Sequence, residues 1–411
     1  MRRSVPWKAV DPRLLSIFTV VFVDLLGFGL ILPLLPYYAW AYGATESSVG
    51  LLVSAYAAMQ LVAAPLLGRL SDRLGRRPVL VVSVAGSAAG FGLLAAAEGL
   101  SPQLAGWLGL DGRGWALTML FAGRLVSGAT GGNLSVAQAY IADITGPQDR
   151  ARGFGLVGAA FGLGFILGPA LGGFLSRWGY SLPALAAALL AVLNLFLVVW
   201  RLPESRQGVR AGCPPAQRPE RVVRSGGIAA LLTVRVLFSL AFAVFQTMFP
   251  LYALLRFRLS GQDTGLILSY VGVLLVLTQT FLVGRLGRRV PESRLIPAGL
   301  ALMTLSLFGW ALAPSVPWLL VVLLPASVAG GLLNTSLNAT LSRAVGPEQV
   351  GTVLGLGAAG ESLMRVVAPV LGGLLMEGLG TAGPGFFSAA LLLGLTPFAA
   401  RVLRGARTAV M

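Results

Sequence analysis

Two acidic side chains, Asp24 and Glu361, stand in long apolar stretches of this sequence, where an ionisable group is unusual. Asp24 follows Arg13 by eleven residues, which in a helix that begins near Arg13 places Asp24 about 16 Å along the axis. An ionised carboxylate that deep in an apolar layer is costly and marks a functional site by default. Its affinity for a proton depends on the surrounding charges, so a change of surroundings can load or release the proton. Both acids therefore predict proton-transfer chemistry, and a purely structural role as partner of an arginine is the alternative for each.

Arginines accompany these acids. Glu361 and Arg365 are four residues apart in "GESLMRVVAP" and share one face of a helix. Arg235 lies in another apolar stretch, where it could pair with Glu361 or meet an anionic group of a substrate. Glu361 is thus a second candidate for a proton or substrate site, with a self-contained Glu361–Arg365 pair as the alternative.

The elements that must position these side chains are long apolar helices. Of the 411 residues, 56% are hydrophobic and 11% are charged, whereas soluble globular proteins carry about 25% charged residues. Apolar runs long enough to cross a hydrocarbon core of about 30 Å recur from end to end. Too little polar surface remains to cover a soluble core, so we predict an all-α membrane protein. Twelve transmembrane spans are expected at residues 14–40, 48–69, 78–98, 116–143, 152–176, 182–201, 226–255, 264–287, 294–313, 316–342, 351–376 and 384–403.

The basic residues are distributed unevenly between the two sides of these spans. Of the 31 Lys and Arg residues, the loops of one side hold only Arg113, Arg177, Arg256 and Arg258. Apart from three arginines inside spans, the others gather at both termini and in alternate loops. This positive-inside pattern predicts that both termini are cytoplasmic. Topology thereby explains the net charge of +16, and no nucleic-acid partner is expected.

Several other kinds of chemistry lack the residues that they need. Cys213 is the sole cysteine and there is no histidine, so we expect neither a disulfide within the chain nor a Cys- or His-based metal site. The sequence has no phosphate-binding Walker loop and no nucleophile–base pair, which argues against direct use of ATP and against an enzyme. No cofactor is expected. The first apolar run is too long for a signal peptide, so no cleaved leader is expected.

The two halves of the sequence resemble each other. "GPQDRARGFGLVGAAFGLGFILGPALGG" from Gly146 aligns without gaps with "GPEQVGTVLGLGAAGESLMRVVAPVLGG" from Gly346. Parallel six-span repeats form one large transporter architecture, whose substrate lies near the membrane midplane between the repeats. We expect a six-helix bundle at residues 1–201, a cytoplasmic linker at 202–225 and a second six-helix bundle at 226–411.

A cluster of charge, "GRLSDRLGRRP", joins the second and third spans. It resembles the signature loop of the major facilitator superfamily, whose pattern is filled here by Gly68, Leu70, Asp72, Gly75, Arg76 and Arg77. Glycines permit a short turn between packed helices, and Asp72 can pair with an arginine or with a helix N-terminus. Arg76 could reach Asp143 at the end of the fourth span. The resemblance implies a conformational lock that holds the outward-open state, with a simple positive-inside anchor as the alternative. The corresponding turn "GRLGRRVPES" has no acid at the matching place, so a weaker lock is expected there.

Two further motifs resemble the drug:proton antiporters of this superfamily. The pattern around Asp24 in "FVDLLGFGLILPLLPYY" is similar to their first span, and Arg124 in "GRLVSGATGG" resembles their fourth-span arginine, which implies that Arg124 is the charge partner of Asp24. "GLGFILGPALGG" resembles their fifth-span antiporter motif through Gly164, Gly168, Pro169, Gly172 and Gly173. Its small residues let helices approach closely, and Pro169 is expected to break the helix and permit bending.

Neutral polar and aromatic residues in the spans are candidates for a substrate cavity. The substrate-binding candidates are Phe28, Gln138, Arg235, Gln246, Asn334, Asn338 and Arg365, and the aromatic rings of Phe245 and Phe249 could add apolar walls. An alternative for each of these residues is that it only packs.

Together these features predict a proton-coupled antiporter that exports small amphiphilic compounds by alternating access, with Asp24, Glu361 and Arg124 in proton coupling. The alternative is an exporter of the same fold for a physiological solute such as a sugar, a lipid or an organic anion. The sequence is similar to tetracycline efflux proteins but has Gly90 near their third-span Asp and no histidine, which argues against tetracycline itself. Protons, a small-molecule substrate and the lipid bilayer are the expected partners of a monomer in a bacterial inner membrane.

Overall fold

The computed structural model describes residues 11–99, 106–107, 111–146, 149–205, 226–346 and 348–408. Most of the predicted linker, with Cys213, lies outside these ranges. The described part is helical and contains no strand. Its helices are α1 (Pro12–Ile31), α2 (Leu35–Ala41), α3 (Glu46–Leu74), α4 (Arg76–Gly99), α6 (Gly112–Ala129), α7 (Asn133–Ile144), α8 (Arg150–Leu175), η1 (Ser176–Trp178), α9 (Ser181–Arg201), α11 (Gly226–Phe257), α12 (Gly261–Leu277), η2 (Thr278–Leu282), α13 (Val283–Arg289), α14 (Glu292–Ala311), α15 (Val316–Arg343), α16 (Val350–Leu379) and α17 (Gly383–Thr408).

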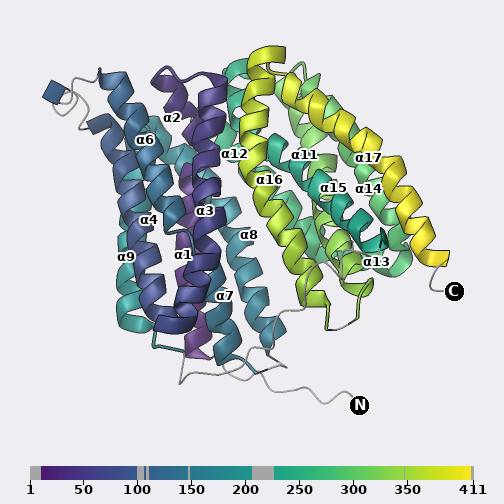
Figure 1. The fold of residues 1–411 in the computed structure, drawn as a ribbon. Coiled ribbons are helices and arrows are strands. Elements are labelled where there is room, and N and C mark those ends of the chain that lie inside the picture. The colour runs from purple at the N-terminus through teal and green to yellow at the C-terminus, as the bar shows by residue number, and fades with distance from the viewer. Residues whose placement is uncertain are drawn as a thin grey trace.

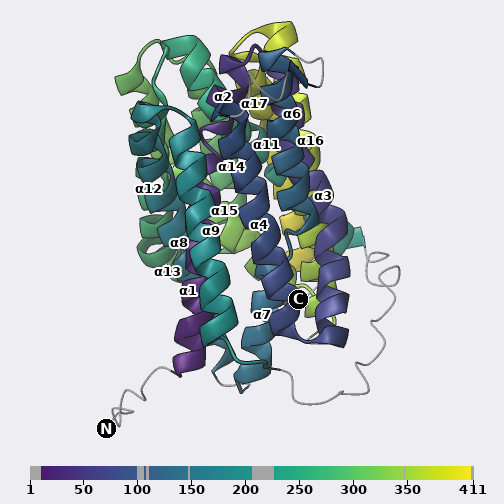
Figure 2. The same cartoon turned by 90° about the vertical axis from the view of Figure 1, so that its left-hand side faces the viewer.

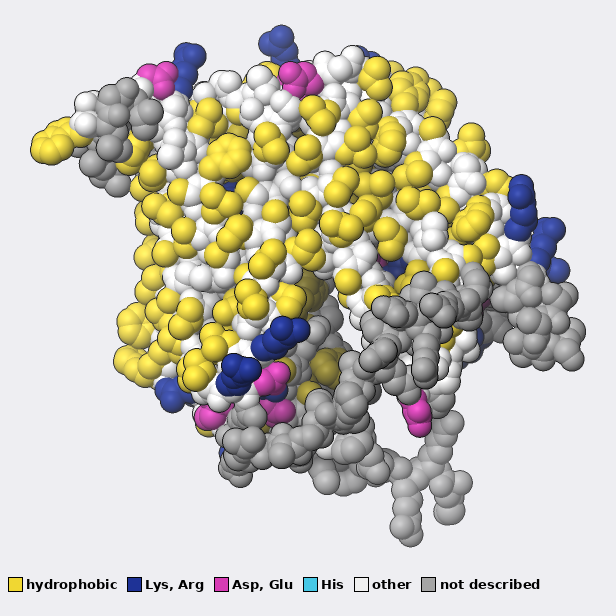
Figure 3. Space-filling view, viewed as in Figure 1, with side chains coloured by type: hydrophobic (Ala, Val, Ile, Leu, Met, Phe, Trp, Pro, Cys, Tyr) yellow, Lys and Arg dark blue, Asp and Glu magenta, His cyan; other side chains and the backbone are white. Residues whose placement is uncertain are grey.

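Within the described residues, 11 helical segments are long and apolar enough to cross a membrane. Large apolar side chains such as Leu189, Trp200 and Leu305 are exposed. Hydrophobic side chains cover most of the described surface between the two ends of the molecule in Figure 3, as expected for a surface that faces lipid. The protein is therefore a multi-pass membrane protein with the all-α architecture predicted from the sequence.

The remaining predicted span, 116–143, is not one continuous helix. It is divided into α6 and α7 by Thr130, Gly131 and Gly132. Here Gln60 of α3 donates from Nε2 to the backbone oxygen of Gly131 at 3.1 Å, and a Cβ atom on Gly132 would lie 2.9 Å from Cβ of Leu67. The paired glycines thus let the broken backbone approach α3 closely.

The helices form two bundles that repeat the same helix pairings (Figures 1 and 2). In the first bundle α1 packs on α8 and α9, and α4 packs on α6 and α9. In the second bundle α11 packs on α16 and α17, and α14 packs on α15 and α17. Each of these four pairings of the first half therefore recurs in the second, as the internal sequence repeat leads one to expect.

The two bundles meet through two equivalent helix pairs, α3 with α16 and α8 with α12. Ser54 of α3 donates to the backbone oxygen of Val366 at 2.6 Å, and Ser269 of α12 donates to that of Ile166 at 2.7 Å. The helices of the two bundles converge on the side of the molecule opposite the termini, which we call the closed side, and diverge toward the termini side (Figure 1). The space-filling view shows a hollow between the two bundles on the termini side (Figure 3).

Glycines allow the helices of the two bundles to approach each other closely on the closed side. A Cβ atom on Gly50 would lie 3.0 Å from the backbone carbonyl carbon of Pro369, and one on Gly265 would lie 3.1 Å from that of Pro169. The prediction that Pro169 breaks its helix is wrong, because α8 continues through this residue to Leu175. The role of Pro169 seen here is to present its carbonyl to Gly265 of the other bundle.

Candidate substrate and proton site

Asp24 lies at the break between α6 and α7. Its Oδ1 atom accepts a hydrogen bond of 2.7 Å from Nδ2 of Asn133, the first residue of α7. Asn133 is 8% exposed, so this bond forms away from bulk solvent. The sequence analysis missed Asn133, although a polar residue directly after Gly131–Gly132 in an apolar span is a signal that could have revealed it.

A small cavity adjoins this pair. Asp24 and Asn133 line it together with Val20, Val21, Leu25 and Leu134, and about 10 Å³ of it is open to the centre of a water molecule. That is close to the space that a single water needs, and both polar side chains offer hydrogen-bond partners. The carboxylate therefore lies beside a place where one water could pass a proton to it.

Arg124 does not pair with Asp24 as predicted. It is 1% exposed, and its guanidinium carbon lies 4.4 Å from the ring centroid of Tyr56 and 5.9 Å from that of Phe28. The Phe28 and Tyr56 centroids are themselves 5.4 Å apart. Asn133 holds the carboxylate, while two aromatic faces hold the cation through cation–π attraction.

Glu361 and Arg235 join α16 to α11 inside the second bundle. Nε of Arg235 donates to Oε1 of Glu361 at 2.9 Å, and the two side chains are 7% and 27% exposed. Gly357 makes room for the guanidinium, since a Cβ atom there would lie 2.8 Å from one of its nitrogens. The structure thus forms one of the two pairings that the sequence left open for Arg235.

The other predicted substrate residues are spread over four helices. Gln138 of α7, Gln246 of α11, Asn334 of α15 and Arg365 of α16 are exposed. Asn338 donates from Nδ2 to Oδ1 of Asn334 at 3.3 Å. These residues are available at the surface of the bundles, but this conformation does not gather them into one pocket.

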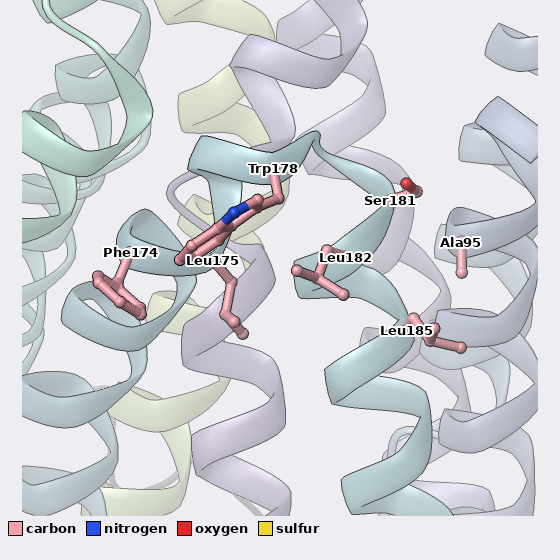
Figure 4. Close-up of a pocket in the computed structure, with 7 residues that line it drawn as sticks. All are labelled: Ala95, Phe174, Leu175, Trp178, Ser181, Leu182 and Leu185. Carbon is pink, nitrogen blue, oxygen red and sulfur yellow. The ribbon is translucent and has the colours of Figure 1, made fainter.

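The expectation that Phe245 and Phe249 line a cavity is wrong. They are 4% and 0% exposed and belong to the core of the second bundle, where the ring of Phe245 meets that of Trp310 at 5.1 Å. A depression of about 770 Å³ lies elsewhere, on the outer flank of α8, η1 and α9 (Figure 4). Its lining is almost wholly apolar, so it offers no proton chemistry.

The charged turn between α3 and α4 forms the ion pairs that the motif predicted. Arg76 lies 2.7 Å from Oδ1 of Asp72 and 3.0 Å from Oδ2 of Asp143 on α7. Arg77 donates to the backbone oxygen of Val199 on α9. Gly75 ends α3 at φ 104°, a conformation that favours glycine. Gly68, by contrast, has nothing within 4 Å of its Cβ position, so packing in this state does not require a glycine there.

Glu204, which follows α9, completes this turn and was missed in the sequence analysis. Its carboxylate accepts hydrogen bonds from the backbone N–H groups of Arg76 at 2.9 Å and Arg77 at 3.1 Å. An anion at the N-terminus of α4 is stabilised by the unpaired amides there. Glu204, within the predicted linker, therefore ties the chain that follows α9 to the charged turn.

The second half has a counterpart of the Arg76–Asp143 pair with the charges exchanged. Glu292 at the start of α14 lies 2.9 Å from Arg343 at the end of α15. Arg343 occupies the position that corresponds to Asp143 in the sequence repeat. The turn that lacks an acid at the motif position is thus accompanied by an acid a few residues further on.

The glycines of the antiporter motif let α8 pack closely against α1 in its own bundle and against α12 in the other bundle. Cβ atoms on Gly164 and Gly168 would meet α1 at Leu25 and Gly29, at 2.9 Å and 2.7 Å, and Gly172 packs against Leu30. A Cβ atom on Gly173 would lie 2.8 Å from the backbone oxygen of Gly261 on α12. One glycine-rich helix thus joins the helix that carries Asp24 to the opposite bundle.

Two repeated six-helix bundles, closed at one end and holding buried charges between apolar walls, define a membrane transporter of the alternating-access type. The family profile of the Major Facilitator Superfamily matches residues 17–369 and 231–409, and the chain belongs to this superfamily.

Curated relatives cover most of the chain. It is 36% identical to the class C tetracycline resistance protein of Escherichia coli, over 87% of this chain and 88% of the relative. It is 34% identical to the class G protein of Vibrio anguillarum, over 85% and 87%. Among solved structures, the human organic anion transporter MFSD10 has a TM-score of 0.65 at 25% identity and covers 94% of this chain and 99% of its own. The nucleoside transporter NupG has a TM-score of 0.74 at 14% identity, over 96% and 99%, and supports the fold alone.

Proposed function

We propose that this protein is a proton-coupled antiporter that exports small amphiphilic compounds, including drugs, by alternating access. The observation that carries the proposal is Asp24, a carboxylate inside a span that is held by a neutral amide beside a water-sized cavity. Such a group can exchange a proton without breaking an ion pair. The tetracycline resistance proteins among the relatives support export of drugs as the direction of transport.

The proposed setting is a bacterial inner membrane, with both termini and the linker at 202–225 in the cytoplasm. The excess of arginines on the termini side supports this orientation. The hollow between the bundles then opens to the cytoplasm, where an exporter takes up its substrate. We expect a monomer, because each bundle repeat finds its partner within the same chain.

The test is transport in proteoliposomes with an imposed pH gradient. Asp24→Asn keeps the hydrogen-bonding shape but cannot be charged or discharged, so uphill transport should be lost while substrate binding stays measurable. Ser87→Ala, a change to another buried polar residue beside Asn133, is the matched control and should keep coupled transport. Full pH-driven transport by Asp24→Asn would exclude Asp24 as the coupling group, and loss of coupling in Glu361→Gln instead would move that role to Glu361.

A further inference from the structure

The charges inside the spans do not balance among themselves. The acids are both engaged, Asp24 with Asn133 and Glu361 with Arg235. Within the described residues, neither Arg124 nor Arg365 has a carboxylate at ion-pair distance. A guanidinium cannot lose its proton in a protein, so Arg124 and Arg365 remain without an ion pair, and three arginines face only two acids inside the spans.

Tyr56 of α3 touches one of these arginines, and the other lies on the helix that packs beside it. The ring of Tyr56 covers Arg124 at 4.4 Å. Arg365 of α16 precedes Val366, whose backbone oxygen accepts a hydrogen bond from Ser54, two residues before Tyr56. The two helices belong to different bundles and pack against each other. Arg365 is exposed and Tyr56 is partly exposed, whereas Arg124 is buried beneath the ring and its Nε has no hydrogen-bond partner. A ligand can therefore reach Arg365 directly, whereas the ring of Tyr56 covers Arg124.

We propose that Arg124, Arg365 and Tyr56 form a subsite for the acidic group of an amphiphilic organic anion, and that the apolar part of this substrate packs on the ring of Phe28. The exposed guanidinium of Arg365 can bind a carboxylate, sulfonate or phosphate in a two-pronged manner, and the buried charge of Arg124 attracts the same anion without direct contact. Tyr56 positions the substrate by presenting a ring face beside the cations. This inference rests on the proposed export function and narrows its substrate class.

The experiment compares two fluorescent compounds that differ in one group, 1-pyrenebutyrate and its neutral alcohol 1-pyrenebutanol, bound to the purified full-length chain. A charge-assisted contact should make the carboxylate bind about tenfold more tightly than the alcohol. Arg365→Gln removes an exposed charge and should abolish this preference while leaving the alcohol unaffected. Arg124→Lys keeps the buried charge and should keep most of the preference, because Arg124 acts through its charge and does not contact the ligand.

Arg285→Gln is the matched control, since it removes an exposed arginine of α13 whose side chain donates to the backbone oxygen of Phe281, one turn earlier in η2. This substitution should change neither the affinity for 1-pyrenebutyrate nor that for 1-pyrenebutanol.

A competition experiment identifies the source of the anion. Competition by short-chain phosphatidylglycerol, but not by phosphatidylcholine, would support an anion site that binds a lipid headgroup. No competition by either lipid would support a site for a free organic anion. Equal binding of both pyrene compounds to the unaltered chain would overturn the inference, even if pH-driven transport of neutral compounds stands. Absence of all pH-driven transport with a retained carboxylate preference would instead overturn the proposed function.

Discussion

A guanidinium buried in a helix bundle keeps its charge, so Arg235 depends on the carboxylate of Glu361 for neutralisation. Glu361→Gln should therefore lower the free energy of unfolding by about 2–3 kcal/mol, somewhat less than for a fully buried pair because Glu361 is partly exposed. Thermal unfolding of the detergent-purified protein measures this change. We also expect altered substrate preference in transport assays.

The matched control is Glu292→Gln, which breaks an ion pair of the same length whose arginine is 73% exposed. An exposed pair contributes about 0–1 kcal/mol, so little change is expected. Equal effects of the two substitutions would show that burial does not set the importance of the Arg235–Glu361 pair.

Asp24 shows which properties of a single residue can be predicted from the sequence and which cannot. Its depth in an apolar run identified it as a functional candidate, because charge in a span is costly wherever the chain folds. Its partner could not be predicted in the same way. Arg124 lies in the right span, but the break after Thr130 brings Asn133 to Asp24 and leaves Arg124 between aromatic rings. A backbone break of three residues decided which side chain reaches the acid.

At the scale of the element, the broken fourth span contains glycines that allow α3 to pack closely against it. A Cβ atom on Gly128 would lie 2.8 Å from Cβ of Met59 and 3.1 Å from the Cα of Tyr56, which is backbone and cannot move cheaply. Gly128→Ala should therefore destabilise the protein by about 1–3 kcal/mol through overpacking. Gly155→Ala in α8 faces open space and should instead stabilise it slightly. Thermal unfolding of both variants provides the test, and a neutral Gly128→Ala would contradict the close contact.

A close contact of another glycine, Gly90, explains one departure from the tetracycline efflux proteins. A Cβ atom on Gly90 of α4 would lie 2.7 Å from the backbone oxygen of Gly123 on α6, next to Arg124. A larger, acidic side chain could not be accommodated at this position without separating the two helices. The sequence revealed the missing acid, but only the packing of α4 on α6 shows why it is absent.

The charged turn between α3 and α4 should affect the balance between the open and closed conformations more than it affects the free energy of unfolding. Asp72 is 61% exposed, so Asp72→Asn should change the free energy of unfolding by less than about 1 kcal/mol. If the turn locks the bundles together on the termini side, the loss of the Asp72 charge should increase the population that is open there. Spin labels at Arg73 and Gly351, in a Cys213→Ala background, report that opening. Unchanged distance distributions would contradict the lock and favour a simple topological anchor.

Gly68 gives an independent test of this lock. Its Cβ position is empty in the present conformation. If the space is filled when the bundles close on the termini side, Gly68→Leu should leave thermal stability nearly unchanged but favour the open population with the same spin labels. Gly155→Leu, at a similarly empty position of α8, should have no effect on that distance.

At the scale of the whole molecule, the internal repeat is visible in how the closed side is built. Ser54 and Gly50 contact α16 as Ser269 and Gly265 contact α8, so the two halves use the same residues in the same order. The sequence predicted the repeat, the spans and the architecture, since these depend on apolar length and on glycine and proline positions. It could not predict which side is closed, because apolar length and the positions of glycine and proline are the same in every conformation of the chain.

The two contacts of the closed side are not equally strong. The hydroxyl oxygen of Tyr37 lies 2.5 Å from Oγ1 of Thr264, which adds a buried hydrogen bond between α2 and α12. The repeat places Leu251 and Val49 at the corresponding positions, and their side chains cannot form such a bond. The α8–α12 side should therefore resist opening more than the α3–α16 side.

Tyr37→Phe tests this asymmetry, because it removes the hydroxyl and keeps the ring. A net hydrogen bond contributes about 1 kcal/mol, so the population open on the closed side should rise by a factor of about five. Spin labels at Ala41 and Leu379 measure this opening. Tyr42→Phe is the control, because a neighbouring, partly buried tyrosine loses its hydroxyl there.

Ser54→Ala and Ser269→Ala should each increase the open population by a similar factor, and their effects should add because the two serines share no partner. If Tyr37→Phe behaves like Tyr42→Phe while both serine variants open the molecule, the two contacts are equivalent in strength and the bundles separate symmetrically.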